Sequence, residues 1–304
     1  IIIIRETRVL RAKIRILSII FFGFVSRPKP HTTLASILAM PLPPASITKV
    51  LTSYVIAAEL KAGKVKADDQ VMMSENAWRK GGAGTDGSYS GFPVNQTARL
   101  EEMEKGMAVQ SGNDAAIALA EHVAGSQEAF ASLMNSYAAK IGMKNSNFVN
   151  AHGLTAEGHY STAYDLALLG RALVRDFPET YAYNKIKEFT VGPITQPNRN
   201  LLLWRDQSVD GIKTGHTSAA GYCLLSSAQQ LFGETYGKGE NFHLWFAAMA
   251  LLQAGEQRLG FQGHRMRDQP RALRDARPDR IEHIGIEAAA DEYEIGRASC
   301  RERV

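Results

Sequence analysis

Residues 209–221 read VDGIKTGHTSAAG, and this stretch decides the expected fold. Residues 211–217 and 221–228 are short runs bounded by glycine, which we interpret as the two strands of one β-hairpin. The dipeptide Asp210-Gly211 before them is a turn signal. The first strand carries Lys213-Thr214-Gly215, where a glycine lets another extended backbone approach closely.

Several helices are predicted upstream of this hairpin. Apolar residues recur three and four positions apart from Ile47 to Ala58, and Gly63 follows, which indicates a helix with an apolar stripe. Ser46 and Lys49 are three residues apart at its first turn, so they share a face that is not the apolar one. Further helical patterns, the last with Thr162 as a capping residue, cover residues 100–110, 114–124, 129–141 and 162–174. Residues 81–91 form a loop rich in glycine and serine.

The composition is that of a globular protein, and it argues against several classes of partner. Of the 304 residues, 45% are apolar and 22% are charged. The net charge is +4, but residues 41–230 contain 17 Lys and Arg against 18 Asp and Glu, so we expect no nucleic-acid partner. No apolar run reaches the roughly 18 residues of a membrane span. With two cysteines and no metal-ligand spacing, we expect no disulfide framework, metal or cofactor.

Three short motifs occur in order along the chain: Ser46-x-x-Lys49, Ser111-Gly112-Asn113 and Lys213-Thr214-Gly215. The first is expected about once by chance in a chain of this size, whereas each tripeptide is expected well under about 0.1 times. Their predicted contexts are a helix start, a loop between helices and a strand. Together they indicate one catalytic site better than three unrelated surface features.

The residue types fit a serine nucleophile that is activated by a lysine. A serine hydroxyl is a weak nucleophile until a nearby base takes its proton. Lys49 can be that base only when its amine is neutral, and a second cation, for which Lys213 is the candidate, would lower its pKa, as would a helix N-terminus. Ser111 can relay a proton to a leaving amine, and Asn113 can orient Lys49 or the substrate backbone.

At these motifs the chain resembles the serine D-alanyl-D-alanine carboxypeptidases, which are low-molecular-mass penicillin-binding proteins. The resemblance covers about residues 40–229 and includes the stretches 44–49, 110–115, 152–154, 198–200 and 209–221. It implies an α/β fold of the β-lactamase/transpeptidase type, an antiparallel sheet flanked by helices. It also implies removal of the terminal D-alanine from peptidoglycan pentapeptides ending in D-Ala-D-Ala, inhibition by β-lactams, a periplasmic location and attachment to the membrane surface.

The resemblance implies roles for individual residues. Ser46 is the implied acyl-ester nucleophile and Lys49 its proton acceptor, with Ser111 assisting proton transfer. The backbone N–H groups of Ser46 and His216 would form the oxyanion hole. The other implied residues bind substrate: Asn113, Lys213, Thr214, Gly215, Thr217 and Arg199. Judged from its own context, Arg199 is as readily a surface arginine as a carboxylate clamp.

Two other functions remain open at this point. A class A β-lactamase-like hydrolase needs a deacylating glutamate, usually with an asparagine four residues later. Glu157 is followed at that distance by Ser161, and Glu179 by Tyr183, so this function ranks below the carboxypeptidase. The third hypothesis is a penicillin-binding fragment without turnover. His152 and His159 are interpreted as loop or core histidines.

The two ends of the chain differ from the middle. Residues 1–40 place a basic stretch before the apolar run 16–25, which is the layout of a signal peptide, although a basic flank on a buried strand is an alternative. Residues 41–230 are the expected catalytic domain. We expect residues 231–304 to be a frame-shifted tail, in which 242–252 is a strand or a helix and 294–304 resembles a translated sequencing adapter. The fold is therefore expected to be incomplete at both ends.

Overall fold

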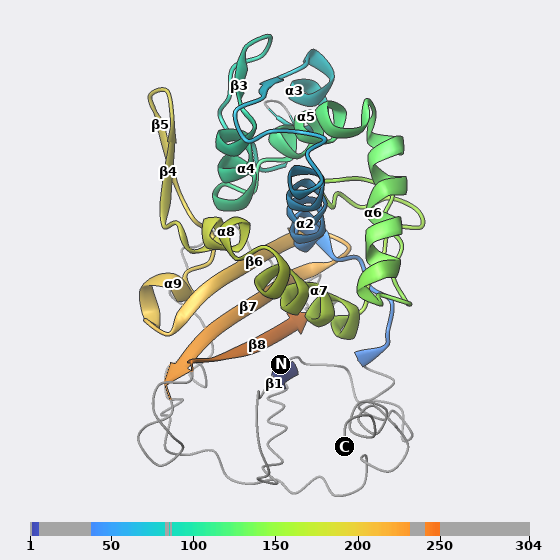
Figure 1. The fold of residues 1–304 in the computed structure, drawn as a ribbon, viewed down its shortest axis with the longest axis vertical. Coiled ribbons are helices and arrows are strands. Elements are labelled where there is room, and N and C mark those ends of the chain that lie inside the picture. The colour runs from blue at the N-terminus through green and yellow to red at the C-terminus, as the bar shows by residue number, and fades with distance from the viewer. Residues whose placement is uncertain (1, 6–37, 83–84, 86, 232–240, 250–304) are drawn as a thin grey trace, which may run out of the picture. The chain divides into compact units, whose positions relative to one another are not determined.

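The computed structural model describes residues 2–5, 38–82, 85, 87–231 and 241–249 (Figure 1). All of them fall in one compact unit, residues 1–255. The signal-peptide layout after residue 5 and the adapter-like segment 294–304 lie outside the described residues. The domain boundaries after residues 40 and 230 stay predictions.

A four-stranded antiparallel sheet carries the predicted hairpin, in the strand order β1-β8-β7-β6. β6 (Val209–Thr217) and β7 (Gly221–Leu231) form that hairpin. β8 (Asn241–Met249) pairs with β7, and β1 (Ile2–Arg5) pairs with β8. Residues 241–249, in the region left open between a strand and a helix, are thus a strand, and the strand at residues 2–5 was not predicted. Within the described sheet β6 is an edge strand, the type of strand with which an extended peptide can pair.

The turn predicted at Asp210-Gly211 is wrong. Both residues lie inside β6, where the pairing register with β7 shifts between Val209 and Gly211. Ser227 donates a 2.9 Å hydrogen bond to the Asp210 carboxylate, and the Tyr181 hydroxyl donates another. The same residue types that suit a turn also suit an irregularity in a strand, and the tertiary hydrogen bonds decide between the two.

A 3-10 turn, η1 (Ala45–Ile47), leads into α2 (Thr48–Lys61), which is the helix predicted from the apolar spacing between Ile47 and Ala58. The prediction of an apolar stripe beside a polar face is wrong, because both polar and apolar residues of this helix are buried from residue 48 to 57. α2 lies at the centre of the helices and contacts α4, α5, α6 and α7, whose bounds follow (Figure 1). Its buried polar groups have partners: Thr52 Oγ1, for example, donates to the Ala151 carbonyl at 2.7 Å.

The four helices predicted downstream of α2 are confirmed to within a few residues. They are α4 (Leu100–Val109), α5 (Asn113–Ala124), α6 (Gln127–Ile141) and α7 (Ala163–Asp176). Thr162 caps α7 as predicted, because its Oγ1 accepts from the Asp165 N–H at 3.1 Å. α7 lies on one face of the sheet (Figure 1), where Gly170 lets it approach Ile212 of β6 and Leu225 of β7. The antiparallel sheet with helices against it confirms the predicted fold class.

Eight further short elements of the described chain were not predicted: β2 (Gln70–Met72), α3 (Glu75–Gly81), β3 (Thr97–Arg99), α8 (Pro178–Tyr181), η2 (Ala182–Lys185), β4 (Glu188–Val191) and β5 (Ile194–Pro197), which form a hairpin, and α9 (Leu202–Arg205). None of the helices in the described part of the chain is both long enough and apolar enough to cross a bilayer.

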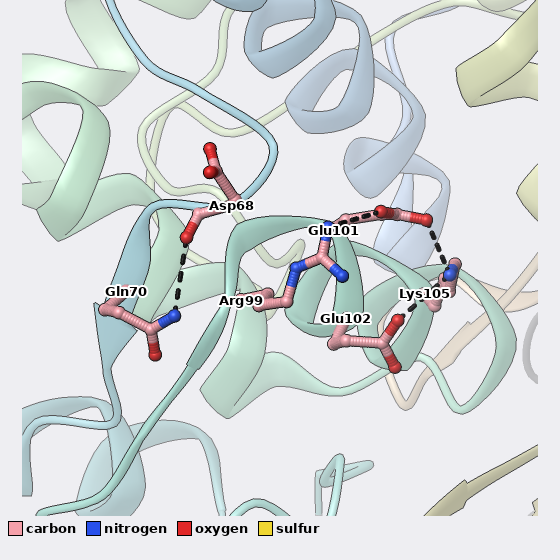
Figure 2. Close-up of polar contacts among 6 residues, drawn as sticks. All are labelled: Asp68, Gln70, Arg99, Glu101, Glu102 and Lys105. Carbon is pink, nitrogen blue, oxygen red and sulfur yellow. Dashed lines mark hydrogen bonds and ion pairs between the residues drawn. The ribbon is translucent and has the colours of Figure 1, made fainter.

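Where β3 meets α4, charged side chains form surface ion pairs (Figure 2). Arg99 lies 3.4 Å from Glu101, and Lys105 lies 2.7 Å from Glu101 and 3.0 Å from Glu102. Such pairs contribute only about 0–1 kcal/mol each, because water screens them. We therefore interpret this cluster as a solvated face of the helical region.

Candidate active site

The first motif lies where η1 becomes α2. The Lys49 Nζ is 2.9 Å from the Ser46 Oγ, as the one-turn spacing requires. Ser46 is half-buried, whereas Lys49 is only 1% exposed. A hydroxyl that a substrate can reach is thus backed by an amine that water hardly reaches.

Two carbonyl oxygens also contact the Lys49 amine. The side-chain Oδ1 of Asn113 accepts at 2.6 Å, and the backbone oxygen of His152 accepts at 2.7 Å. The first and second motifs are therefore brought together, although 64 residues separate Lys49 from Asn113 in sequence.

Burial lowers the pKa of Lys49 well below its ordinary value, because a buried amine loses the hydration that favours its charge. The charge of Lys213 lowers it further, and that of Arg199 adds to this, while Asp114 opposes it. The predicted influence of Lys213 has the right sign. The larger cause, burial, was missed because a surface helix face was expected.

Ser111 lies in the connection between α4 and α5, two residues before Asn113, and is 2% exposed. Its φ of 63° is in the left-handed region, which costs energy for a residue with a side chain. The loop before β3 stabilises this connection, since the Asn113 N–H donates to the Ser88 carbonyl at 2.7 Å. Asp114 accepts from the Ser90 N–H at 2.8 Å.

The third motif lies on β6 and faces the first. Gly215 is needed there, because a Cβ on it would lie 3.0 Å from the Ser46 nitrogen and 3.1 Å from the Ala45 Cβ. The β6 backbone therefore runs directly past the N–H of Ser46. Thr214 and Thr217 are half-buried beside it, and His216 is exposed.

Lys213 is 3% exposed, and its Nζ donates to the Thr214 carbonyl at 3.1 Å. Burial lowers its pKa to about 7, with the charge of Arg199 as the second cause. Arg199 is exposed and lies in the turn after β5. The charge of Arg199 also lowers the pKa of Lys49, whereas its role as a carboxylate clamp stays a prediction.

Sequence reasoning missed the role of the segment around His152. The His152 carbonyl binds Lys49, and a backbone oxygen has no signature in a sequence. Gly153 has φ 89°, and a Cβ on it would lie 1.9 Å from the Ala45 carbonyl oxygen. The signals available were the resemblance at residues 152–154 and this glycine, since glycine is the residue that fits a left-handed conformation pressed against another backbone.

Both nearby histidines are buried and bonded to the backbone. The Leu154 N–H donates to the His152 Nδ1 at 3.1 Å, and burial lowers the pKa of His152 to about 3. The Val149 N–H donates to the His159 Nδ1 at 3.1 Å. These contacts fit the interpretation of both as loop or core histidines. The described residues contain no group of three His, Cys, Asp or Glu side chains that could hold a metal ion.

The D-alanyl-D-alanine carboxypeptidase family matches residues 38–232. The chain belongs to this family. Among the family's curated members, D-alanyl-D-alanine carboxypeptidase DacC of Escherichia coli K12 is 53% identical over 192 residues, which cover 62% of this chain and 48% of that protein. DacA of the same organism is 49% identical over 189 residues, covering 62% of this chain and 47% of DacA.

A solved structure supports the same membership. Penicillin-binding protein 5 from Haemophilus influenzae matches with a TM-score of 0.63 and 39% identity, covering 70% of this chain and 60% of that one. The chain described here spans about half the length of the curated relatives it matches.

Proposed function

We propose that the chain is a serine D-Ala-D-Ala carboxypeptidase that removes the terminal D-alanine from peptidoglycan stem peptides. The observation that carries this proposal is the environment of the Lys49 amine, which contacts the Ser46 hydroxyl and two carbonyl oxygens. Its family membership supports the same activity.

The contacts of Lys49 also suit the neutral amine that a base requires, and burial is what favours that form. A neutral amine has two N–H donors and one lone pair. The oxygens of Asn113 and His152 use both donors, so the lone pair is left for the Ser46 hydroxyl, which then donates to it. Because burial already disfavours the charged form, this arrangement gives Ser46 a ready proton acceptor.

The proposed reaction has two steps. The Ser46 Oγ attacks the carbonyl carbon of the penultimate D-alanine while its proton moves to Lys49. The C–N bond then breaks, and the leaving amine takes a proton that Ser111 relays, which releases D-alanine. Water adds to the ester, and Ser46 regains its proton as the shortened peptide leaves.

Stabilisation of the oxyanion is assigned to the N–H groups of Ser46 and His216. The closeness of Gly215 to the Ser46 nitrogen supports this, because it brings the β6 backbone beside that N–H. Since β6 is an edge strand, an extended peptide can pair with it. On this proposal Asn113 also orients the peptide backbone.

The substrate's terminal carboxylate is assigned to four side chains near β6: Lys213, Thr214, Thr217 and Arg199. Lys213 and Arg199 supply positive charge, and the threonines supply hydroxyl donors. A β-lactam also presents a carbonyl beside a carboxylate, so we propose that it acylates Ser46. Since the substrate is cell-wall peptidoglycan, the proposed location is the periplasm, at the membrane surface.

A β-lactamase function is less well supported. It requires a base that activates the deacylating water, and the two glutamates that the sequence offered, Glu157 and Glu179, are both exposed.

The test is covalent labelling combined with product analysis. A fluorescent penicillin should label the full chain, and Ser46→Ala should abolish labelling, while Ser132→Ala on the outer face of α6 should not. An acylated peptide ending in D-Ala-D-Ala should release D-alanine. Labelling that persists in Ser46→Ala contradicts the nucleophile. Rapid penicillin turnover without D-alanine release indicates a β-lactamase, and labelling without either reaction indicates a non-catalytic binder.

A further inference from the structure

The turn that carries Arg199 has an unusual distribution of burial. Asn198 is 5% exposed and Asn200 is 1% exposed, whereas Arg199 between them is exposed. Asparagine is rarely buried unless its amide is fully hydrogen-bonded. Both amides here are bonded to backbone groups of other segments.

Asn198 ties the turn to the segment that leads from η2 to β4. Its Nδ2 donates to the carbonyls of Asn184 at 3.1 Å and Ile186 at 2.9 Å. Its Oδ1 accepts from the N–H of Asn200 at 2.9 Å, across the arginine. The backbone on both sides of Arg199 is therefore held by one buried side chain.

Asn200 ties the same turn to the motif strand. Its Nδ2 donates to the Gly211 carbonyl at 3.1 Å, two residues before Lys213 on β6. Its Oδ1 accepts from the Leu202 N–H at 3.2 Å. The turn that carries Arg199 is thus anchored to the strand that carries Lys213.

We propose that Asn198 and Asn200 are positioning residues, which hold Arg199 at the motif strand by fastening its turn to the η2–β4 segment and to β6. The inference rests on the proposed function, in which Arg199 binds the substrate carboxylate. Binding a substrate costs conformational entropy, both in the arginine side chain and in any mobile backbone that carries it. A turn that is already rigid before binding removes the backbone part of this cost. The charge of Arg199 lowers the pKa of Lys213, so a displacement of Arg199 should be detectable at Lys213.

The test uses two substrates that differ only at the group Arg199 recognises. They are an acylated peptide ending in D-Ala-D-Ala and the same peptide with an amidated C-terminus. We expect Arg199→Ala to lower the ratio of their kcat/KM values by about ten- to a hundredfold, the usual effect of losing a charged hydrogen bond. Asn200→Ala should lower the same ratio by about three- to tenfold. In the double variant Arg199→Ala/Asn200→Ala, the ratio of kcat/KM values should equal that of Arg199→Ala alone.

Asn135→Ala is the matched control, because Asn135 also bonds backbone groups through both amide atoms, to Phe148 at 2.7 and 2.9 Å, but lies on α6. It should lower stability and leave the substrate ratio unchanged. An Asn200→Ala variant that slows both substrates equally, or that adds its full effect to Arg199→Ala, overturns the proposal. If Asn200→Ala does not fold, Asn198→Ala takes its place with the same expected outcomes.

A second readout does not depend on turnover. In protein with isotope-labelled lysines, the NMR titration of Lys213 should shift upward in both Arg199→Ala and Asn200→Ala, because the neighbouring positive charge is removed or displaced. An upward shift in Arg199→Ala alone contradicts the positioning role. If the wild type releases no D-alanine, the proposed function fails, while this titration still decides whether the asparagines place Arg199.

Discussion

Replacing Gly153 by alanine should disable the site, although this residue has no chemistry of its own. The new Cβ would lie 1.9 Å from the Ala45 carbonyl oxygen, whereas ordinary contact begins near 3.4 Å, so the two backbones must separate by about 1.5 Å. That separation moves Ser46, which follows Ala45, away from the His152 carbonyl that binds Lys49. A misplacement of about 1 Å typically costs about a hundredfold in rate.

Acylation by a labelled penicillin, followed over time, measures this effect. We expect the acylation rate constant of Gly153→Ala to fall by at least about a hundredfold. Gly158→Ala is the control, because Gly158 has a similar φ of 75° in the same loop, but the nearest atom to its added Cβ is 3.7 Å away. Both variants bear the left-handed strain of about 1–2 kcal/mol, and only one has the clash. Equal acylation rates in the two folded variants would refute the reasoning.

Three further predictions concern stability. Because the pKa of Lys213 is about 7 in the folded protein and about 10.4 when unfolded, the unfolded chain binds more protons between these values. The free energy of unfolding in urea should therefore rise from pH 7 toward pH 10, and Lys213→Met should flatten that rise. Thr162→Ala removes the N-cap of α7 and should cost about 1 kcal/mol in the same urea titration, without changing penicillin acylation. Asp114→Ala leaves the Ser90 N–H and hydroxyl without their acceptor and should cost about 3 kcal/mol, with a thermal unfolding midpoint that drops accordingly; an unchanged midpoint contradicts the buried contact.

The local features of this fold could be predicted because short-range physics specifies them. The helices α4 to α7 follow from the spacing of apolar residues, and Thr162 caps α7 through a contact three residues along the chain. The β6–β7 hairpin likewise connects neighbours in sequence. Short elements such as the β4–β5 hairpin carry too few residues for a periodic pattern.

The sequence by itself determined which residue types stand at the three motifs and which local element carries each of them. Only the tertiary structure decided that residues 48–57 of α2 are buried on all sides, which makes burial the main cause of the lowered pKa of Lys49. It also decided that a backbone carbonyl of His152 and the close approach of Gly153 complete the site. The physical reason is that burial and backbone contacts arise between segments about a hundred residues apart, and no local pattern of side chains encodes them.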